Sequence, residues 1–348
     1  MTGLSPGRPP RSHAANSYDF VRFCAASAVI FSHHYFLSGR DEPVVPLYGE
    51  DFGELGVEIF FCLSGFLICQ SLYRSRDWVR FAAARLLRIF PNLAVALIFT
   101  SVATLLWFGN GIHWRDHIGY VTGNVAMALT GLTDLIPGVF ERSFSAEVND
   151  PLWTLPYEMW LYVVLALLFA IGRRYAGLAV IAALIVFGAA WLVAHAGNDF
   201  DVGPLESYDA FRLASYFLSG ATLAVIWPTL ERHAVAVGFA GLILAVAVQQ
   251  FAPPDTPLHA LTLAAAVIGL GSSRAMAWYG RGGDPSYGMY IFAWPIQQFS
   301  LLLIGSFWLS LLVAFAAATA IGYATWHGFE RRIMTYPSRI AARITRSA

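Results

Sequence analysis

The chain contains no lysine, few charged residues of any kind and only three cysteines. Arginine supplies all 22 basic residues of the 348, and 13% of the residues are charged, whereas soluble domains average about 25%. A hydrophobic content of 57% therefore excludes a soluble globular protein with an ordinary charged surface. Because 22 acidic residues balance the arginines, the chain lacks the net positive charge of a nucleic-acid-binding protein, and no nucleic-acid partner is expected.

The three cysteines predict neither a disulfide framework nor a metal site. Cys24, Cys62 and Cys69 each lie in an apolar stretch, and no CxxC pair is present. Small disulfide-bonded or zinc-binding domains use paired cysteines in polar loops. We therefore expect these thiols to be small buried side chains, and we expect no metal.

Long apolar runs predict an all-α membrane protein. About 20 apolar residues are needed to cross a hydrocarbon core of about 30 Å. Ten runs approach that length, which predicts a polytopic bundle of about ten transmembrane helices. The expected spans are 18–38, 54–73, 89–108, 152–172, 176–196, 209–227, 233–251, 257–273, 285–304 and 307–329. A weaker run, 118–133, predicts a re-entrant or interfacial segment.

The arginines are unevenly distributed over the loops of this topology. With the N-terminus inside, 17 arginines fall in cytoplasmic segments: Arg8, Arg11, Arg74, Arg76, Arg80, Arg85, Arg88, Arg173, Arg174, Arg232, Arg274, Arg281, Arg331, Arg332, Arg339, Arg343 and Arg346. Three fall in outer loops: Arg40, Arg115 and Arg142. Because basic residues concentrate in cytoplasmic loops, this bias predicts that both termini are cytoplasmic.

One membrane domain with short polar ends is expected. Residues 1–17 are rich in Pro, Ser and Arg and lack the apolar core of a signal peptide, which predicts a disordered cytoplasmic N-terminus. The transmembrane domain is expected at 18–330, and a basic cytoplasmic tail at 331–348. The chain is therefore predicted to be a multi-pass protein surrounded by membrane lipids.

Ionisable side chains inside a span are costly and are candidates for function. The first span carries Asp19, Arg22, His33 and His34. Arg22 and His33 are three helical turns apart, so they share one face with about 16 Å of rise between them. His34 points about 100° away from His33, so the two histidines are not expected to do the same work. Each histidine taken alone is as well explained by a structural hydrogen bond.

Two further spans carry a carboxylate near their predicted outer ends. Glu58 lies in the run 56–66 and is either a counter-ion for an imidazolium or a residue that reaches the membrane boundary. Glu158 follows Pro151 and Pro156 and is expected at about the depth of His33 and Glu58. A histidine and carboxylates that meet at one depth would suit general acid–base catalysis.

Arg85 and Arg88 precede Pro91 and lie three residues apart, on one helical face. Their simplest interpretation is positive-inside signalling with contacts to lipid headgroups. The functional interpretation is a clamp for a phosphate-bearing ligand, because guanidinium groups match phosphate oxygens.

Together these segments resemble the acyltransferase-3 family of integral-membrane acyltransferases, which O-acylate bacterial cell-surface glycans and some small molecules. Each motif is weak alone, but they follow the family order over nearly the whole chain. The matching positions are Asp19, Arg22 and His33; residues 56–66, with Glu58 replacing an Asp; Arg85 and Arg88; residues 151–155 with Glu158 and Tyr162; Ser286, Tyr287 and Tyr290; and Phe329 with Glu330.

The resemblance implies transfer of an acyl group, most often acetyl from acetyl-CoA, to a hydroxyl of a surface or lipid-linked glycan at a bacterial inner membrane. Acyl-CoA is then a donor substrate, and no permanently bound cofactor is expected. Its phosphates would meet Arg85 and Arg88, with Arg22 nearby. His33 would be the general base, with Glu158 as its first-choice carboxylate partner and Glu58 as its second.

Other readings stay open at this point. His33 either removes the proton of the acceptor hydroxyl or carries the acyl group covalently. The donor is acetyl or succinyl, and the acceptor is open. A secondary transporter or flippase for a lipid-linked glycan would use the same buried charges as a substrate path. A scaffold role would not explain why the chain tolerates the energetic cost of placing His33 and Glu158 inside membrane spans.

Two departures from the family pattern matter. Trp294-Pro295 stands where the family often has a His before the proline, so any role of that His is absent here. Many members also carry a C-terminal hydrolase-like domain, which this sequence does not include. A transfer step that needs such a domain is expected to take it from another protein.

Overall fold

The structure, a computed structural model, is a bundle of helices. It describes residues 16–46, 48–74, 77–109, 113–198, 200–203, 205–251, 256–334 and 336. The helices are α1 (Tyr18–Leu37), α2 (Phe52–Arg74), α3 (Trp78–Phe108), α4 (Trp114–Val125), α5 (Met127–Thr130), α6 (Thr154–Ala170), α7 (Arg173–His195), α8 (Ser207–Leu230), α9 (Ala234–Phe251), α10 (Pro257–Gly271), α11 (Ser286–Leu303), α12 (Phe307–Thr325) and α13 (Arg331–Ile333).

Short elements join these helices. They are the 3₁₀ turns η2 (Asp150–Trp153), η3 (Glu231–His233) and η4 (Tyr279–Gly282), the π-helical turn η5 (Trp326–Glu330), and the antiparallel strands β1 (Asp201–Val202) and β2 (Leu205–Glu206). Most of the predicted terminal segments 1–17 and 331–348 lies outside the described residues. So do six of the predicted cytoplasmic arginines: Arg8, Arg11, Arg76, Arg339, Arg343 and Arg346.

A helix occupies each of the ten predicted ranges, and seven segments of the described chain are long and apolar enough to cross a membrane. One of them, Ser207–Phe251, contains both α8 and α9, while α10 is apolar but shorter. An all-α, multi-pass membrane fold follows, and the count of ten spans stays a prediction. The weak run 118–133 falls mainly in the short helices α4 and α5.

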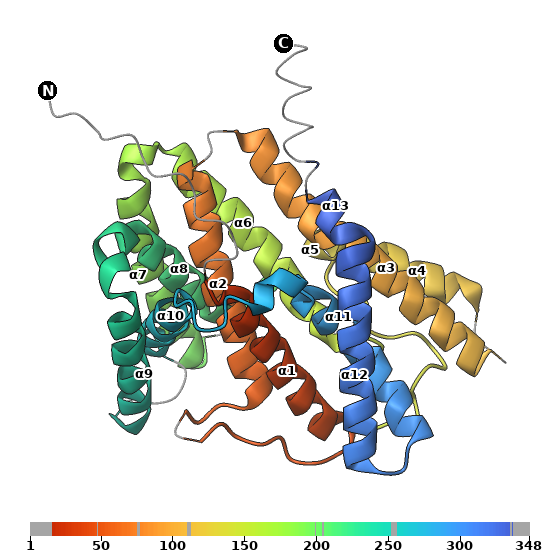
Figure 1. The fold of residues 1–348 in the computed structure, drawn as a ribbon. Coiled ribbons are helices and arrows are strands. Elements are labelled where there is room, and N and C mark those ends of the chain that lie inside the picture. The colour runs from red at the N-terminus through yellow and green to blue at the C-terminus, as the bar shows by residue number, and fades with distance from the viewer. Residues whose placement is uncertain are drawn as a thin grey trace, which may run out of the picture.

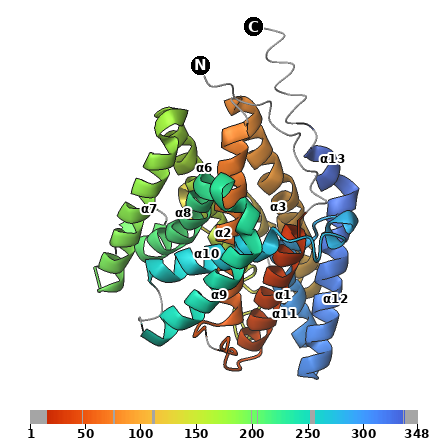
Figure 2. The ribbon, with the colours of Figure 1, turned by 60° about the vertical axis from the view of Figure 1, so that its left-hand side comes forward.

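Helices α1 and α2 run through the middle of the bundle. Helices α7 to α10 flank them on one side, and α3, α4, α11 and α12 lie on the other (Figures 1 and 2). Helix α2 packs along α8, α9 along α10, and α11 along α12. The first helix contacts α2 and α11, so the face that carries Arg22 and His33 points into the bundle rather than into lipid.

Helix α3 begins earlier than the apolar run indicated. It starts at Trp78 instead of residue 89 and is 31 residues long. The Asp77 side chain caps it by accepting a hydrogen bond from the backbone N–H of Arg80 at 2.8 Å. Pro91 lies inside the helix, as prolines do in membrane helices when neighbouring groups satisfy the freed carbonyl. Arg85 and Arg88 therefore stand within a continuous helix.

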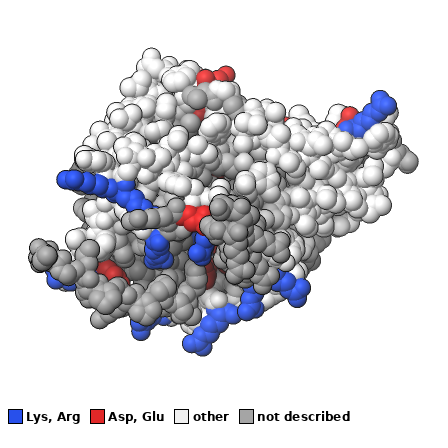
Figure 3. Space-filling view, turned by 90° about the horizontal axis from the view of Figure 1, so that it is seen from above, with Lys and Arg blue, Asp and Glu red and all other residues white. Residues whose placement is uncertain are grey.

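Arginine side chains gather on one face of the bundle. Helices α2 and α6 end there, and α3 and α7 begin there (Figure 1). Seen from that side, arginines stand around the face with few carboxylates between them (Figure 3). The last turn of α2 contributes Arg74, the start of α7 contributes Arg173, and Arg331 and Arg332 form most of α13.

The contact between α2 and α8 depends on two glycines. A Cβ at Gly65 would lie 1.8 Å from the backbone oxygen of Phe217, and a Cβ at Gly220 would lie 2.0 Å from that of Cys62. Small residues let membrane helices approach closely, which replaces the hydrophobic driving force that lipid cannot supply. This approach fixes α2, and with it the side chains that α2 presents to the centre.

We expect Gly220→Leu to force α2 and α8 apart and to lower the thermal stability of the purified protein. Overpacking of a filled interior costs about 1–3 kcal/mol, and a clash with backbone is at the upper end. The measurement is the unfolding midpoint in detergent, with Gly119→Leu as control, because a Cβ at Gly119 meets nothing within 4 Å. Equal midpoints for the two variants would contradict the close approach.

Candidate active site

A cavity of about 100 Å³, called the site cavity below, lies between α1, α2, α3, α6 and α11. Four residues predicted from the sequence line it: Arg22, Arg85, Arg88 and Glu158. Ser64, Tyr162, Ser286, Tyr287 and Tyr290 add hydroxyl groups to its wall. Helices far apart in the sequence thus bring three cations, a carboxylate and several hydroxyls around one small space.

Arg88 is held by two carboxylates. Its Nη2 lies 3.0 Å from Oδ2 of Asp284, and its Nη1 lies 3.3 Å from Oε2 of Glu330. The other oxygen of Glu330 accepts hydrogen bonds from Asn92 at 2.8 Å and from Thr325 at 3.0 Å. The Arg88 guanidinium therefore has a fixed place in the wall, and its charge is already balanced.

Asp284 joins Arg88 to the first helix. The carboxylate oxygen that meets Arg88 is also 3.4 Å from Nη1 of Arg22, and the other oxygen accepts hydrogen bonds from the Ser286 backbone and hydroxyl. Asp284 is 4% exposed. Burial alone raises the pKa of this carboxyl, but the Arg88 and Arg22 guanidiniums outweigh it and hold the pKa below its usual value.

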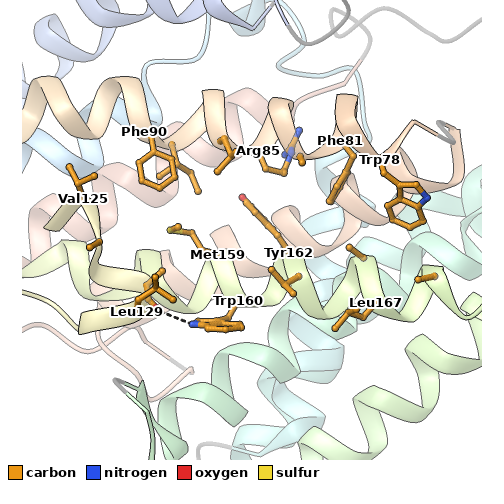
Figure 4. Close-up of a pocket in the computed structure, with 18 residues that line it drawn as sticks. Trp78, Phe81, Arg85, Phe90, Val125, Leu129, Met159, Trp160, Tyr162 and Leu167 are labelled. Carbon is orange, nitrogen blue, oxygen red and sulfur yellow. Dashed lines mark hydrogen bonds between the residues drawn. The ribbon is translucent and has the colours of Figure 1, made fainter. Parts of the chain in front are cut away.

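Arg85 differs from its neighbour. Its guanidinium carbon lies 5.8 Å from the centre of the Tyr162 ring, facing that ring from α3 across to α6 (Figure 4). Its buried Nε has no hydrogen-bond partner, and no carboxylate of the described residues pairs with it. Of the two arginines predicted as a phosphate clamp, Arg85 is thus the one with unused donors.

Glu158 lies deeper than the sequence suggested. Its Oε1 accepts hydrogen bonds from Ser64 at 2.8 Å and from the Tyr162 hydroxyl. Since Ser64 follows Glu58 by six residues of α2, Glu158 sits about 9 Å further along that helix than Glu58. The three residues expected at one depth are therefore spread along the bundle, and Glu158 belongs to the arginine end.

Glu58 does not line the site cavity and interacts with Tyr48 and Arg212 instead. It is fully buried, its Oε2 accepts a hydrogen bond from Tyr48 at 2.9 Å, and its Oε1 lies 3.7 Å from Arg212 of α8. Arg212 also pairs with Glu54 and Asp209. The described counter-ion of Glu58 is therefore an arginine rather than a histidine, and the side chain is enclosed within the bundle.

His33 does not line the site cavity. Its ring meets Trp294 edge-on with 5.0 Å between centroids, and Trp294 follows the cavity residue Tyr290 by four residues on α11. The buried Nδ1 has no hydrogen-bond partner, and the carboxylate whose charge acts on the ring is Asp51. The expected contact of His33 with Glu158 or Glu58 is not among its described contacts.

The other histidine of α1 has a structural place. His34 is fully buried, and its Nε2 lies 2.9 Å from the Ser310 hydroxyl of α12. Trp294, which stands where the family often has a His, packs directly on His33. Its indole N–H donates a hydrogen bond to the Glu147 backbone oxygen at 2.9 Å.

Sequence reasoning missed Asp284 and Asn92, which belong to the network that holds Arg22 and Arg88 in the wall. Asp284 stands two residues before Ser286, just ahead of a predicted span, and a carboxylate at that place was the available signal. Its partners are 196 and 262 residues away, so no local pattern pairs them. Asn92 lies in an apolar run, and a single uncharged amide there gives no signal of a site residue.

Comparison with known proteins identifies the family of the chain. A family model described as an acyltransferase domain, that of the acyltransferase-3 family, matches residues 16–327. The chain is 30% identical to an O-acetyl transferase of Shigella phage Sf6, over 94% of this chain and 98% of the relative. It is 26% identical to nodulation protein 10 of Rhizobium leguminosarum bv. viciae, over 98% and 99%. No solved structure matches significantly.

A third relative is longer than this chain. The putative peptidoglycan O-acetyltransferase YrhL of Bacillus subtilis (strain 168) is 24% identical over 84% of this chain but only 52% of its own length. Because the family model covers nearly the whole sequence, the chain belongs to the acyltransferase-3 family. It is an O-acyltransferase, which decides against the transporter, flippase and scaffold readings.

We expect Asp284→Asn to lower kcat/KM for the acyl donor by about tenfold or more, since hydrogen bonds to charged groups are worth about 1.5–3 kcal/mol. The neutral amide removes the carboxylate that Arg22 and Arg88 share. Each arginine keeps one other carboxylate, Asp19 for Arg22 and Glu330 for Arg88, but both guanidiniums are held less firmly in the wall. Initial rates of acyl transfer by purified protein measure this. Asp41→Asn, at an exposed loop position, is the control. An unchanged rate would mean that the ion-pair network does not serve the reaction.

Proposed function

We propose that the protein is an O-acetyltransferase that moves acetyl from acetyl-CoA to a hydroxyl of a cell-surface or lipid-linked glycan. Its membrane is the bacterial inner membrane, with the arginine-rich face and both termini in the cytoplasm. One observation carries the proposal: Arg22, Arg85 and Glu158 converge on one cavity, and His33 packs on Trp294, four residues along α11 from the cavity residue Tyr290. The printed name of the phage relative supports acetyl as the group transferred.

The donor enters from the arginine-rich face. The diphosphate of acetyl-CoA binds the unused donors of Arg85, with Arg22 and Arg88 holding the wall behind it. A guanidinium fork suits phosphate oxygens, and burial strengthens the attraction. The cavity of about 100 Å³ is small beside typical ligand sites of about 300–1,000 Å³, which favours a small acyl group.

The acceptor hydroxyl reacts at the opposite end. His33 takes the hydroxyl proton, the oxygen bonds to the thioester carbonyl carbon, and the carbon–sulfur bond breaks to release the CoA thiolate, which is protonated to the thiol. In the covalent variant, a nitrogen of His33 first takes the acyl group from the thioester and then gives it to the acceptor oxygen.

The two predicted glutamates act as positioning residues in this scheme. Glu158 holds the Tyr162 hydroxyl, whose ring faces Arg85 on the donor side. Glu58 fixes α2 against Arg212 of α8. Both roles differ from the direct pairing with His33 that the sequence suggested, and they assign Glu158 to donor binding.

We expect His33→Ala to lower acetyl transfer by about 10²–10⁴-fold, the usual contribution of a general acid–base residue. The measurement is O-acetylation of the surface glycan by mass spectrometry in cells that carry the variant at wild-type membrane levels. His195→Ala, at the exposed end of α7, is the matched control. Wild-type acetylation by His33→Ala would refute both the base and the covalent role.

Arg85→Ala is expected to raise KM for acetyl-CoA by about tenfold or more while changing kcat less, because a charge-assisted contact worth about 1.5–3 kcal/mol is lost from donor binding. Arg80→Ala is the control, because Arg80 is an exposed arginine of the same helix outside the cavity. If both variants raise KM equally, the effect belongs to the overall charge of the face and not to Arg85.

A further inference from the structure

The hydrogen bonding of α11 is interrupted close to His33. Pro295 lies inside α11 and has no backbone N–H, so the carbonyl of Ile291, four residues earlier, loses its usual helical donor. The Asn149 side chain donates a hydrogen bond to this carbonyl at 2.9 Å, and Asn149 is 1% exposed. A carbonyl without a donor is costly inside a membrane protein. Asn149 therefore completes the hydrogen bonding of α11 where the proline interrupts it.

The chain around Asn149 follows α11 in both directions. We call residues 147–151 the strap, because further hydrogen bonds join their backbone oxygens to side chains of α11. These are donated by Trp294 to Glu147 at 2.9 Å, by Gln298 to Glu147 at 2.7 Å and by Tyr290 to Pro151 at 3.0 Å. The partners on α11 descend in number as the strap ascends, so the strap runs antiparallel to the helix and is bonded along its length.

Trp294 links the strap to His33. Its indole meets the His33 ring edge-on with 5.0 Å between centroids, while the buried Nδ1 of His33 has no hydrogen-bond partner among the described residues. Trp294 is 1% exposed, and a closely packed interior leaves such an indole no room to turn. The hydrogen bond to the strap fixes the rotation of the indole, and the indole in turn limits the rotation of the imidazole.

We propose that Trp294 and Asn149 are positioning residues for His33 in acyl transfer. Asn149 holds α11 at the point that Pro295 interrupts, the strap sets the indole of Trp294, and the indole orients the imidazole toward the acceptor hydroxyl. This rests on the proposed function, in which His33 acts as the base or the acyl carrier, and it deepens that function by naming the residues that hold His33.

The position of α11 affects both parts of the proposed site. One turn before Trp294, the same helix carries Tyr290 in the wall of the site cavity. Reacting groups gain much of their rate from correct geometry, and a misplacement of about 1 Å can cost about 10²-fold. A loosened strap is thus expected to slow transfer although no reacting group has been removed.

The kinetic test removes these contacts in steps. Trp294→Leu loses both the ring and the N–H, whereas Trp294→Phe keeps a ring, so we expect kcat to fall by about 10²-fold in the first and about tenfold in the second. Asn149→Leu is expected to lower kcat by about tenfold with KM for acetyl-CoA unchanged. Purified proteins in nanodiscs receive labelled acetyl-CoA and the surface glycan extracted from cells that lack the gene.

Two matched controls make the same kinds of change away from the strap and α11. Trp191→Phe alters a fully buried tryptophan of α7, and Asn198→Leu alters an exposed asparagine just beyond that helix. Both are expected to keep the wild-type kcat.

A magnetic-resonance readout reports the His33 ring itself. In protein labelled at histidine, the His33 signal is the one that His33→Ala lacks. Because an aromatic ring shifts the signals of protons beside it, Trp294→Leu is expected to move the His33 ring-proton signal. Asn149→Leu is expected to move it too, although both rings are retained. A merely structural change leaves the signal of the folded protein in place, as expected for Trp191→Phe.

Pro295→Ala tests whether Asn149 serves the carbonyl that the proline leaves free. Alanine restores a backbone N–H at position 295, which can bond Ile291 within the helix. The fall in unfolding midpoint caused by Asn149→Leu is therefore expected to be smaller in the Pro295→Ala background, since residues that share a partner do not act additively. Midpoint changes that simply add would contradict the role of Asn149.

Wild-type kcat and an unmoved His33 signal in the Trp294 and Asn149 variants would overturn the inference, as would equal falls in the two controls. Trp294→Phe, which keeps an aromatic ring, carries the test where Trp294→Leu does not insert into the membrane. Failure of the proposed function looks different, because His33→Ala would then itself transfer acetyl at the wild-type rate.

Discussion

The arrangement of the site depends on the ion pairs that the Asp284 carboxylate makes with Arg22 and Arg88. In a lipid environment an unpaired guanidinium is costly, so Arg22 and Arg88 must find counter-ions within the protein. The Asp284 carboxylate serves both, Asp19 lies 3.7 Å from Arg22 as well, and Glu330 pairs with Arg88 from the turn that follows α12. The first, third and last long helices and the loop before α11 are therefore held together by electrostatics that lipid makes strong. Removing one member of the network leaves an unpaired buried charge. The resulting loss of stability exceeds the net contribution of any single intact ion pair.

This network also separates two kinds of arginine. Arg88 is neutralised and structural, while Arg85, one turn earlier, carries no ion pair among the described residues. The same residue type thus occurs once with its charge paired and once with donors that are free to bind the proposed donor phosphate. The difference comes entirely from which neighbouring helix each side chain faces, α11 with η5 in one case and α6 in the other.

The helices were largely predictable because apolar runs of about 20 residues leave little choice in a membrane. Even so, the start of α3 was placed eleven residues late, since its first three turns are polar enough to resemble a loop while the Asp77 cap keeps them helical. The arginines of the site were found because charges in apolar runs stand out. Asp284 and the true partners of Glu58 and Glu158 were not, because they depend on how distant helices pack. Register between helices is set by contacts such as those of Gly65 and Gly220, and one sequence does not reveal which turns face each other.

The length of α3 has a mechanical consequence. At about 1.5 Å per residue, its 31 residues form a rod of about 46 Å, longer than the hydrocarbon core is thick. The exposed Arg80 and the half-buried Arg85 and Arg88 stand on this one helix, which sets the spacing of their backbones. The helix therefore fixes how far the guanidinium groups of Arg85 and Arg88 lie from the exposed end of α3. In the function proposed above, this spacing would select donors by the distance from their phosphates to their reactive carbon.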